Sequence, residues 1–181
     1  TSGSPITVNP TVSTTYTITS VTDNNGCAVA APHADLTGSA TIDVKTVPEI
    51  AVQPLNQTVC EDAVATFVTD AGGTTNPQYR WYLDTGSGMT IMPGENAATL
   101  SVTAVSAMNG YRYQAEITGD CPDPVLSDIV TLTVNEKPEI ITQPKAVTLC
   151  SGEDAIFTVD AGVTTNPVSY THLTLPTIYS V

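Results

Sequence analysis

Along residues 48–136, apolar and polar side chains alternate in short runs, and glycine, proline, asparagine and aspartate separate these runs. Alternation with a period of two is the pattern of a half-buried β-strand. Many short strands between closely spaced turns are typical of a β-sandwich. The sequence therefore predicts an all-β fold, with strands over residues 49–54, 57–60, 64–71, 78–84, 90–93, 98–105, 111–119 and 128–135. Pro54 removes a backbone donor, so we expect the first strand at a sheet edge.

The same pattern returns after 90 residues. The segment from Pro48 (PEIAVQPLNQTVCEDAVATFVTDAGGTTNP) aligns without a gap with the segment from Pro138 (PEIITQPKAVTLCSGEDAIFTVDAGVTTNP), and 16 of the 30 positions are identical. Weaker matches extend the repeat toward the N-terminus, because 39–50 resembles 128–140 and 14–27 resembles 109–121. A fixed period of this kind indicates repeated structural units. We expect the C-terminal part of one repeat over 1–47, a complete repeat over 48–136, and the N-terminal part of a third over 137–167.

The charge of the chain argues against two classes of binding partner. The chain has 18 acidic and 5 basic residues and a net charge of −13, so its surface should repel nucleic-acid backbones and anionic membranes. No apolar run approaches the length of a membrane-spanning helix, and we expect no membrane insertion in this segment. The chain lacks an initiator methionine and begins within a repeat, so we interpret it as a fragment of a longer protein.

The motifs TVC, YRWYLDTGSG, ATLSVTAV and MNGYRYQAEITGDC resemble the tandem immunoglobulin-like repeats of large secreted or cell-surface bacterial proteins of the Bacteroidetes adhesin type. The resemblance covers residues 1–167. It implies an immunoglobulin-like (Ig-like) sandwich, an extracellular or cell-surface location and a role as a stalk or adhesion module. Its implied partners are neighbouring repeats of the same chain and a surface glycan or a host or matrix protein. Trp81 and Tyr113 match the family's core tryptophan and strand tyrosine, whereas the antibody-type disulfide positions fall near Thr69 and Ala115.

The cysteines in a protein expected to be exported suggest disulfides. Strand directions place Cys60 and Cys121 at opposite ends of the complete repeat, about 20–25 Å apart, whereas a disulfide needs Cα atoms within about 7 Å. Bonds between adjacent repeats avoid this difficulty, because the end of one repeat meets the beginning of the next. Three alternatives stay open: bonds between repeats, a bond within the repeat, and free thiols. They concern Cys27, Cys60, Cys121 and Cys150.

No catalytic constellation is found, and we expect neither an enzyme nor a bound cofactor. The triplet DTG at 84–86 occurs once, whereas aspartic-protease chemistry needs two carboxylates. The two histidines, His33 and His172, suit neither a catalytic triad nor a zinc site. Calcium is the one alternative, through acidic loops at 22–26, 60–62, 119–123 and 151–154.

Aromatic side chains offer a rival function, that of a carbohydrate-binding or accessory module in a large secreted hydrolase. If one tyrosine of each pair on the strands at 78–84 and 111–119 faces outward, sugars could stack on them. The four tyrosines concerned are Tyr79, Tyr82, Tyr111 and Tyr113.

The last residues, 168–181 (VSYTHLTLPTIYSV), break the repeat. The match to the complete repeat ends at Pro167, and Thr171 stands where Trp81 would recur. This tail resembles the in-frame translation of a transposon adapter used to prepare sequencing libraries. We therefore expect it to be non-native, and His172 is given no chemical role.

Overall fold

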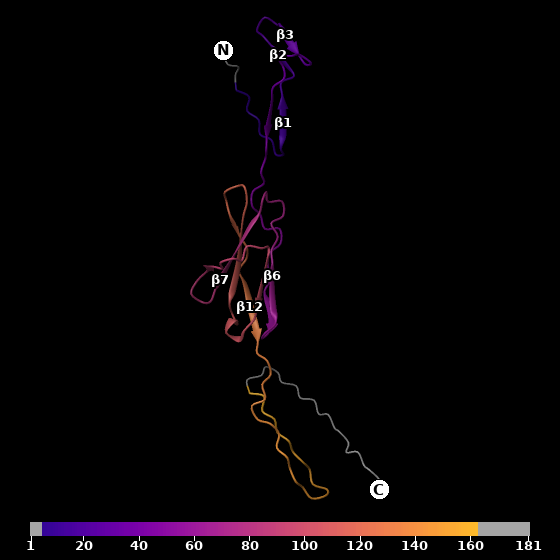
Figure 1. Ribbon diagram of the computed structural model, residues 1–181, viewed down its shortest axis with the longest axis vertical. Helices are drawn as coiled ribbons and strands as arrows, with labels where there is room; N and C mark the ends of the chain where they lie inside the picture. Colours follow the sequence, from indigo (N-terminus) through magenta and orange to yellow (C-terminus); the bar gives the residue numbers. More distant parts are fainter. Residues whose placement is uncertain (1–4, 163–181) are drawn as a thin grey trace, which may run out of the picture.

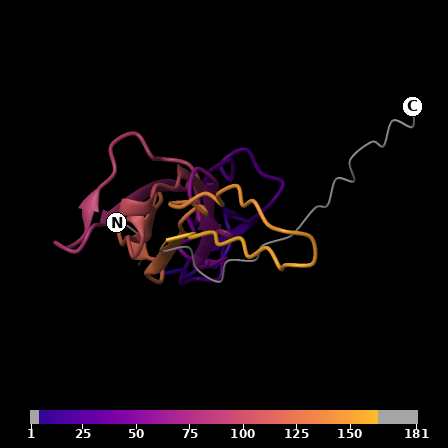
Figure 2. The ribbon, with the colours of Figure 1, turned by 90° about the horizontal axis from the view of Figure 1, so that it is seen from below.

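The computed structural model describes residues 5–162, and its regular structure is almost entirely β-strand. The strands follow one another along a single long axis, with β1 to β4 at the N-terminal end and β5 to β12 in the middle (Figure 1). Viewed along that axis, the described parts overlap one another (Figure 2). Among the described residues, the model has no helix long and apolar enough to cross a membrane.

The middle part is a sandwich of two sheets. The larger sheet has the order β5-β12-β10-β7-β8, with β11 beside β10, and the smaller sheet pairs β6 with β9. Pairing is antiparallel except between β5 and β12, which run parallel. The bounds are β5 Gln57–Cys60, β6 Val64–Val68, β7 Gln78–Asp84, β8 Thr90–Ile91, β9 Thr99–Thr103, β10 Arg112–Thr118, β11 Val125–Leu126 and β12 Val130–Asn135.

The two sheets bury the alternate positions that the sequence pattern selects. In β6, Ala65 and Phe67 are buried while their neighbours are exposed, and β10 and β12 alternate in the same way. Leu100 of β9 completes the inner face of the smaller sheet, opposite Trp81 of β7. Two face-to-face sheets with this strand order form an Ig-like β-sandwich, so the predicted fold class is confirmed.

The first expected strand, 49–54 with its resumption at 57–60, is divided between the two sheets. Val52 forms only an isolated bridge with Asp70, after β6, and the chain then crosses to pair β5 with β12. Pro54, which is buried, lies between these two pairings and has no N–H to continue a ladder. The expectation of one edge strand was therefore wrong in extent, and β11 was not anticipated.

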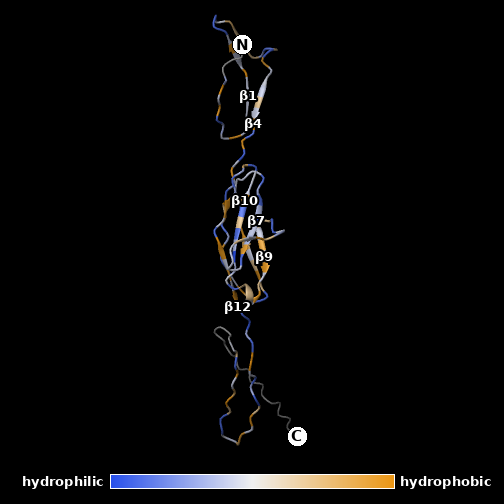
Figure 3. Ribbon diagram, turned by 90° about the vertical axis from the view of Figure 1, so that its left-hand side faces the viewer, coloured by the Kyte–Doolittle hydropathy of each residue, from blue (hydrophilic) through white to orange (hydrophobic). Residues whose placement is uncertain are grey.

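The N-terminal part contains two small antiparallel pairs, β1 (Thr14–Thr17) with β4 (Ser39–Ile42) and β2 (Ser20–Thr22) with β3 (Ala28–Ala30). Hydrophobic residues on this part and on the C-terminal segment are coloured orange in Figure 3. Many of them are exposed, including Ile6 at 89% and Ile18 at 53%. In the described residues, no second sheet covers β1 and β4.

The C-terminal segment repeats a detail of the sandwich. Thr142 bridges to Asp160 as Val52 does to Asp70, and the matching backbone bonds are both 2.8 Å long, from Ile141 N–H to Asp160 and from Ala51 N–H to Asp70. The domain boundaries proposed from the repeat stay a prediction. The expected non-native tail, 168–181, lies outside the described residues.

Candidate functional site at the domain junction

The aromatic core surrounds Trp81 and Tyr113. The Phe67 ring lies 4.8 Å from that of Tyr113 and 6.5 Å from that of Trp81, measured between centroids. The indole N–H of Trp81 donates to the carbonyl oxygen of Ala97 at 2.9 Å. Burial raises the pKa of Tyr113. Both sequence-predicted residues therefore lie inside the sandwich, where they join the two sheets.

Only one of the two tyrosine pairs has the outward-facing member that the sequence pattern predicted. Tyr111 and Tyr113 are two positions apart, so both side chains point to the same, inner face, and Tyr111 packs against the core. On β7, the buried position of Trp81 places Tyr79 on the inner face and Tyr82 on the outer face. The Tyr82 hydroxyl donates to the Glu116 carboxylate. Of the four tyrosines, only Tyr82 has the orientation that a stacking surface needs.

The DTG triplet organises a turn. The carboxylate of Asp84 is 3% exposed and accepts the backbone N–H groups of Gly86 at 2.7 Å and Gly88 at 2.8 Å. Arg112 of the neighbouring strand donates to the other carboxylate oxygen. These hydrogen bonds, the two from the glycines first, hold the pKa of Asp84 below its usual range despite burial.

The tetrapeptide TTNP at 74–77 connects the sandwich to the segment before it. The Thr74 hydroxyl donates to the Ala71 carbonyl at 2.6 Å and accepts the Glu49 N–H at 3.0 Å. The Thr75 hydroxyl accepts the Thr46 N–H at 2.9 Å. Polar groups of one loop therefore bind backbone groups on both sides of Pro48, which is buried. We call residues 45–49 and 73–76, with 119–121, the junction site.

A second loop completes the junction site. Asn76 donates to the Asp120 carboxylate at 2.9 Å, and the same carboxylate lies 3.4 Å from Nζ of Lys45. Gly119 fits closely here, since a Cβ at this position would lie 2.8 Å from both the Thr74 methyl group and the Thr75 carbonyl oxygen. In the sequence, TTNP is distinguished only by its repetition at the 90-residue offset. Its identical recurrence in the sequence at 164–167 was the signal for a contact role within the repeat.

The four cysteines are free thiols in the described structure. Cys121 lies in the junction site, where its Sγ donates to the carbonyl oxygen of Lys45 at 3.7 Å. Cys60 lies at the other end of the sandwich, opposite Asn135 in the β5–β12 register. Cys27 is in the β2–β3 turn and Cys150 in the turn equivalent to that of Cys60, and both are exposed.

Neither the acidic loops nor His33 form a recognisable metal centre. Among residues 5–162, no three His, Cys, Asp or Glu side chains are grouped so that they could hold an ion. His33 accepts the N–H of Asp35 at 3.2 Å within its own turn. Calcium binding through these acidic loops stays an untested prediction.

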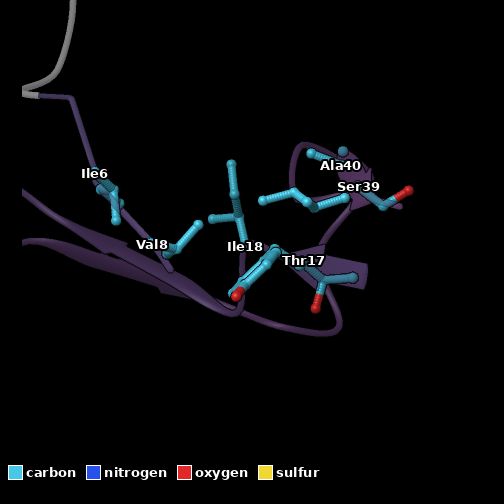
Figure 4. Close-up of a pocket in the computed structure, with 9 residues that line it drawn as sticks. Ile6, Val8, Thr17, Ile18, Ser39 and Ala40 are labelled. Carbon is cyan, nitrogen blue, oxygen red and sulfur yellow. The ribbon is translucent and has the colours of Figure 1, made fainter. Parts of the chain in front are cut away.

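A hollow of about 580 Å³ lies on the N-terminal part, between Ile6, Val8, Ile18 and the β1–β4 pair (Figure 4). Its lining is almost wholly apolar. Two lining residues, Ala40 and Ile42, align at the 90-residue offset with Val130 and Leu132, which are 3% and 0% exposed in the sandwich core. The apolar residues of this hollow therefore correspond to core residues of the sandwich, but here no opposing sheet covers them among the described residues.

No family model matches the sequence. Over 115 residues, 63% of this chain, the sequence is 36% identical to Endoglucanase C of Cellulomonas fimi, and the chain spans 10% of that protein's length. Similar solved structures include a titin I-band fragment, with 20% identity, a TM-score of 0.42 and coverage of 56% of this chain and 37% of that one. The tandem Ig repeats of Dlar show 26% identity, a TM-score of 0.36 and coverage of 54% and 56% respectively.

Proposed function

We propose that this chain is a non-catalytic segment of tandem Ig-like repeats from a large secreted or cell-surface bacterial protein, and that it serves as a stalk or adhesion module. The observation that best supports this proposal is the set of hydrogen bonds in the junction site. A spacer needs modules that keep their orientation, and here the segment joining two modules is hydrogen-bonded into loops of the following one.

The burial of matched positions supports the repeat boundaries at 1–47, 48–136 and 137–167. Phe67 is fully buried, whereas Phe157, its counterpart at the 90-residue offset, is 60% exposed. Exposing a large aromatic side chain forfeits about 1.5–3 kcal/mol of burial free energy. In this proposal each terminal part is one layer of a sandwich whose opposing layer belongs to the rest of its own repeat.

Charge and shape suit an extracellular spacer. The net charge of −13 opposes self-association of neighbouring chains and keeps an extended protein soluble. The chain enters the sandwich beside Cys121 and leaves it beside Cys60. The segments before and after the sandwich extend from its opposite ends (Figure 1). Successive modules therefore add length rather than bulk.

Small-angle scattering tests the spacer role directly. The full chain should scatter as a stiff extended particle, and Thr75→Val with Asn76→Ala should broaden its distribution of shapes by removing three junction hydrogen bonds. Thr133→Val, an exposed change on β12, is the matched control. A chain whose residues 45–47 are replaced by Gly-Ser-Gly provides the flexible reference. Wild-type scattering indistinguishable from this reference would contradict the proposal.

A second candidate function, an accessory module of a polysaccharide-acting protein, is favoured by the similarity to Endoglucanase C. Its most direct test is retention of the full chain on insoluble cellulose. Under this candidate the Tyr82→Ala variant should be retained less, because Tyr82 is the tyrosine on the outer sheet face, while Tyr16→Ala should behave as the wild type. Passage of the wild-type chain without retention would count against it.

A further inference from the structure

Two backbone carbonyls, that of Asn135 at the end of β12 and that of Lys45 three residues after β4, each lie near a cysteine, at opposite ends of the sandwich. At the C-terminal end, the Asn135 carbonyl accepts the Glu61 N–H at 2.9 Å, and Cys60 lies directly opposite Asn135 in the parallel register. At the N-terminal end, the Lys45 carbonyl accepts the thiol of Cys121 at 3.7 Å. The Asn135 carbonyl therefore lies next to the strand position of Cys60 in its own sheet, and the Lys45 carbonyl contacts a cysteine of the following module.

Lys45 and Asn135 are the same position of the repeat. Each lies three residues before the proline that begins the next unit, Pro48 or Pro138. If the end of one repeat at Asn135 is superposed on the segment at Lys45, the two carbonyl oxygens coincide. One carbonyl oxygen has two lone pairs, so it can accept both the N–H that follows Cys60 and the thiol of the next repeat's Cys121 position. Cys60 and Asn135 face each other on paired strands about 4.8 Å apart, so a thiol that bonds the equivalent carbonyl in the next repeat would lie near Cys60. A disulfide requires Cα atoms within about 7 Å.

We propose that adjacent repeats are joined by a disulfide between the cysteine at the Cys60 position of one repeat and the cysteine at the Cys121 position of the next. This inference rests on the tandem-repeat organisation of the proposed function. A bond within one repeat does not fit, because Cys60 lies beside Asn135 whereas Cys121 lies beside Lys45, at the opposite end of the sandwich. The β12 strand alone spans about 20 Å between these ends.

The bond forms by thiol–disulfide exchange with an oxidised small-molecule or protein disulfide. One cysteine thiolate attacks that disulfide and releases a thiol; the second thiolate then attacks the mixed disulfide and releases the other. Two protein thiols are oxidised and one external disulfide is reduced to two thiols. Cys60 is exposed and Cys121 is partly exposed, so both are accessible to the oxidant.

The described chain holds one cysteine of each such pair, so the test extends it by one repeat. A chain of residues 1–137 followed by 48–181 retains every native residue, and its new junction reads Lys137–Pro48, as Lys137–Pro138 does now. Three variants keep two cysteines each, with serine at the others. The first keeps Cys60 of the first copy and Cys121 of the second; the next keeps both cysteines of the first copy; the last keeps Cys121 of the first copy and Cys60 of the second.

After equilibration in a buffer of reduced and oxidised glutathione, the first variant should lose both reactive thiols and two hydrogens of mass, while the other two keep theirs. Fluorescence of Trp81 checks that all three are folded. Oxidation of the same-copy pair, or two free thiols in the first variant, would overturn the disulfide. Scattering of the reduced, extended chain reports the spacer role independently. If the extended chain is stiff but the first variant keeps both thiols after equilibration, only the disulfide is overturned. If the extended chain is flexible in its reduced form, the spacer role is overturned.

Discussion

The hydroxyl of Thr74 lies 3.0 Å from the backbone nitrogen of Glu49 and accepts its N–H, which ties the beginning of the sandwich to a loop 25 residues later. Thr74 is 7% exposed and also donates to the Ala71 carbonyl. The Thr74 side chain therefore stabilises both its own loop within the sandwich and the junction site.

Thr74→Val should therefore destabilise the sandwich. Valine keeps the shape but leaves the Glu49 N–H without its partner, while the Ala71 carbonyl still accepts the Thr74 backbone N–H. One such unpaired donor costs about 1–3 kcal/mol. Urea unfolding followed by Trp81 fluorescence measures the change. Thr103→Val, on the exposed side of β9, should leave the midpoint almost unaltered, and equal effects of the two substitutions would disprove the role of Thr74.

Phe67 and Phe157 occupy the same repeat position, so substituting each one compares the packing of the complete module with that of the C-terminal part. Phe67→Ala removes a fully buried ring that contacts Trp81 and Tyr113, and should lower the free energy of unfolding by about 3–5 kcal/mol. Phe157→Ala, at the same repeat position but exposed, should change it by less than about 0.5 kcal/mol. Calorimetry of both variants compares them, and a large loss for Phe157→Ala would show that the terminal segment is packed.

Gly119→Ala should disturb the junction site. The added methyl would lie 2.8 Å from Thr74 Cγ2 and from the Thr75 carbonyl oxygen, and overpacking of this kind costs about 1–3 kcal/mol. The methyl of Gly38→Ala would meet no other atom within 4 Å, so that variant is the control. Thermal melting reports both, and unchanged melting of Gly119→Ala would show that the two loops separate readily in solution.

Asp84 should account for part of the loss of folding stability at acid pH. Its pKa is lowered in the folded chain, mainly by the N–H groups of Gly86 and Gly88, so its contribution is complete above the unfolded-state value of about 4. The contribution is lost as the pH falls through the lower folded-state pKa. Asp84→Asn should reduce stability at pH 7 and flatten the loss below pH 4, as urea midpoints across pH would show. Asp123→Asn, in an exposed loop, should keep the wild-type profile.

Alternation of apolar residues was enough to predict β6, β7, β10 and β12, because one face of each strand is buried and the other is not. It failed where no face is uniformly buried, as around Pro54, where the chain changes sheets. The orientation of Tyr111 was misjudged because residues two apart share a face. The junction site escaped notice because its contacts join polar loops, which carry no periodic signal.

The parallel pairing of β5 with β12 also determines how the module meets mechanical load. Its N-terminal connection leads into β5 past the Val52–Asp70 bridge, and its C-terminal connection directly follows β12, so tension on the chain slides β5 and β12 past each other along their length. The register pairs from Leu132–Gln57 to Asn135–Cys60 are then sheared together instead of opening one after another. A series of such modules would yield to a pull as discrete units, each resisting until its shear-loaded pair fails.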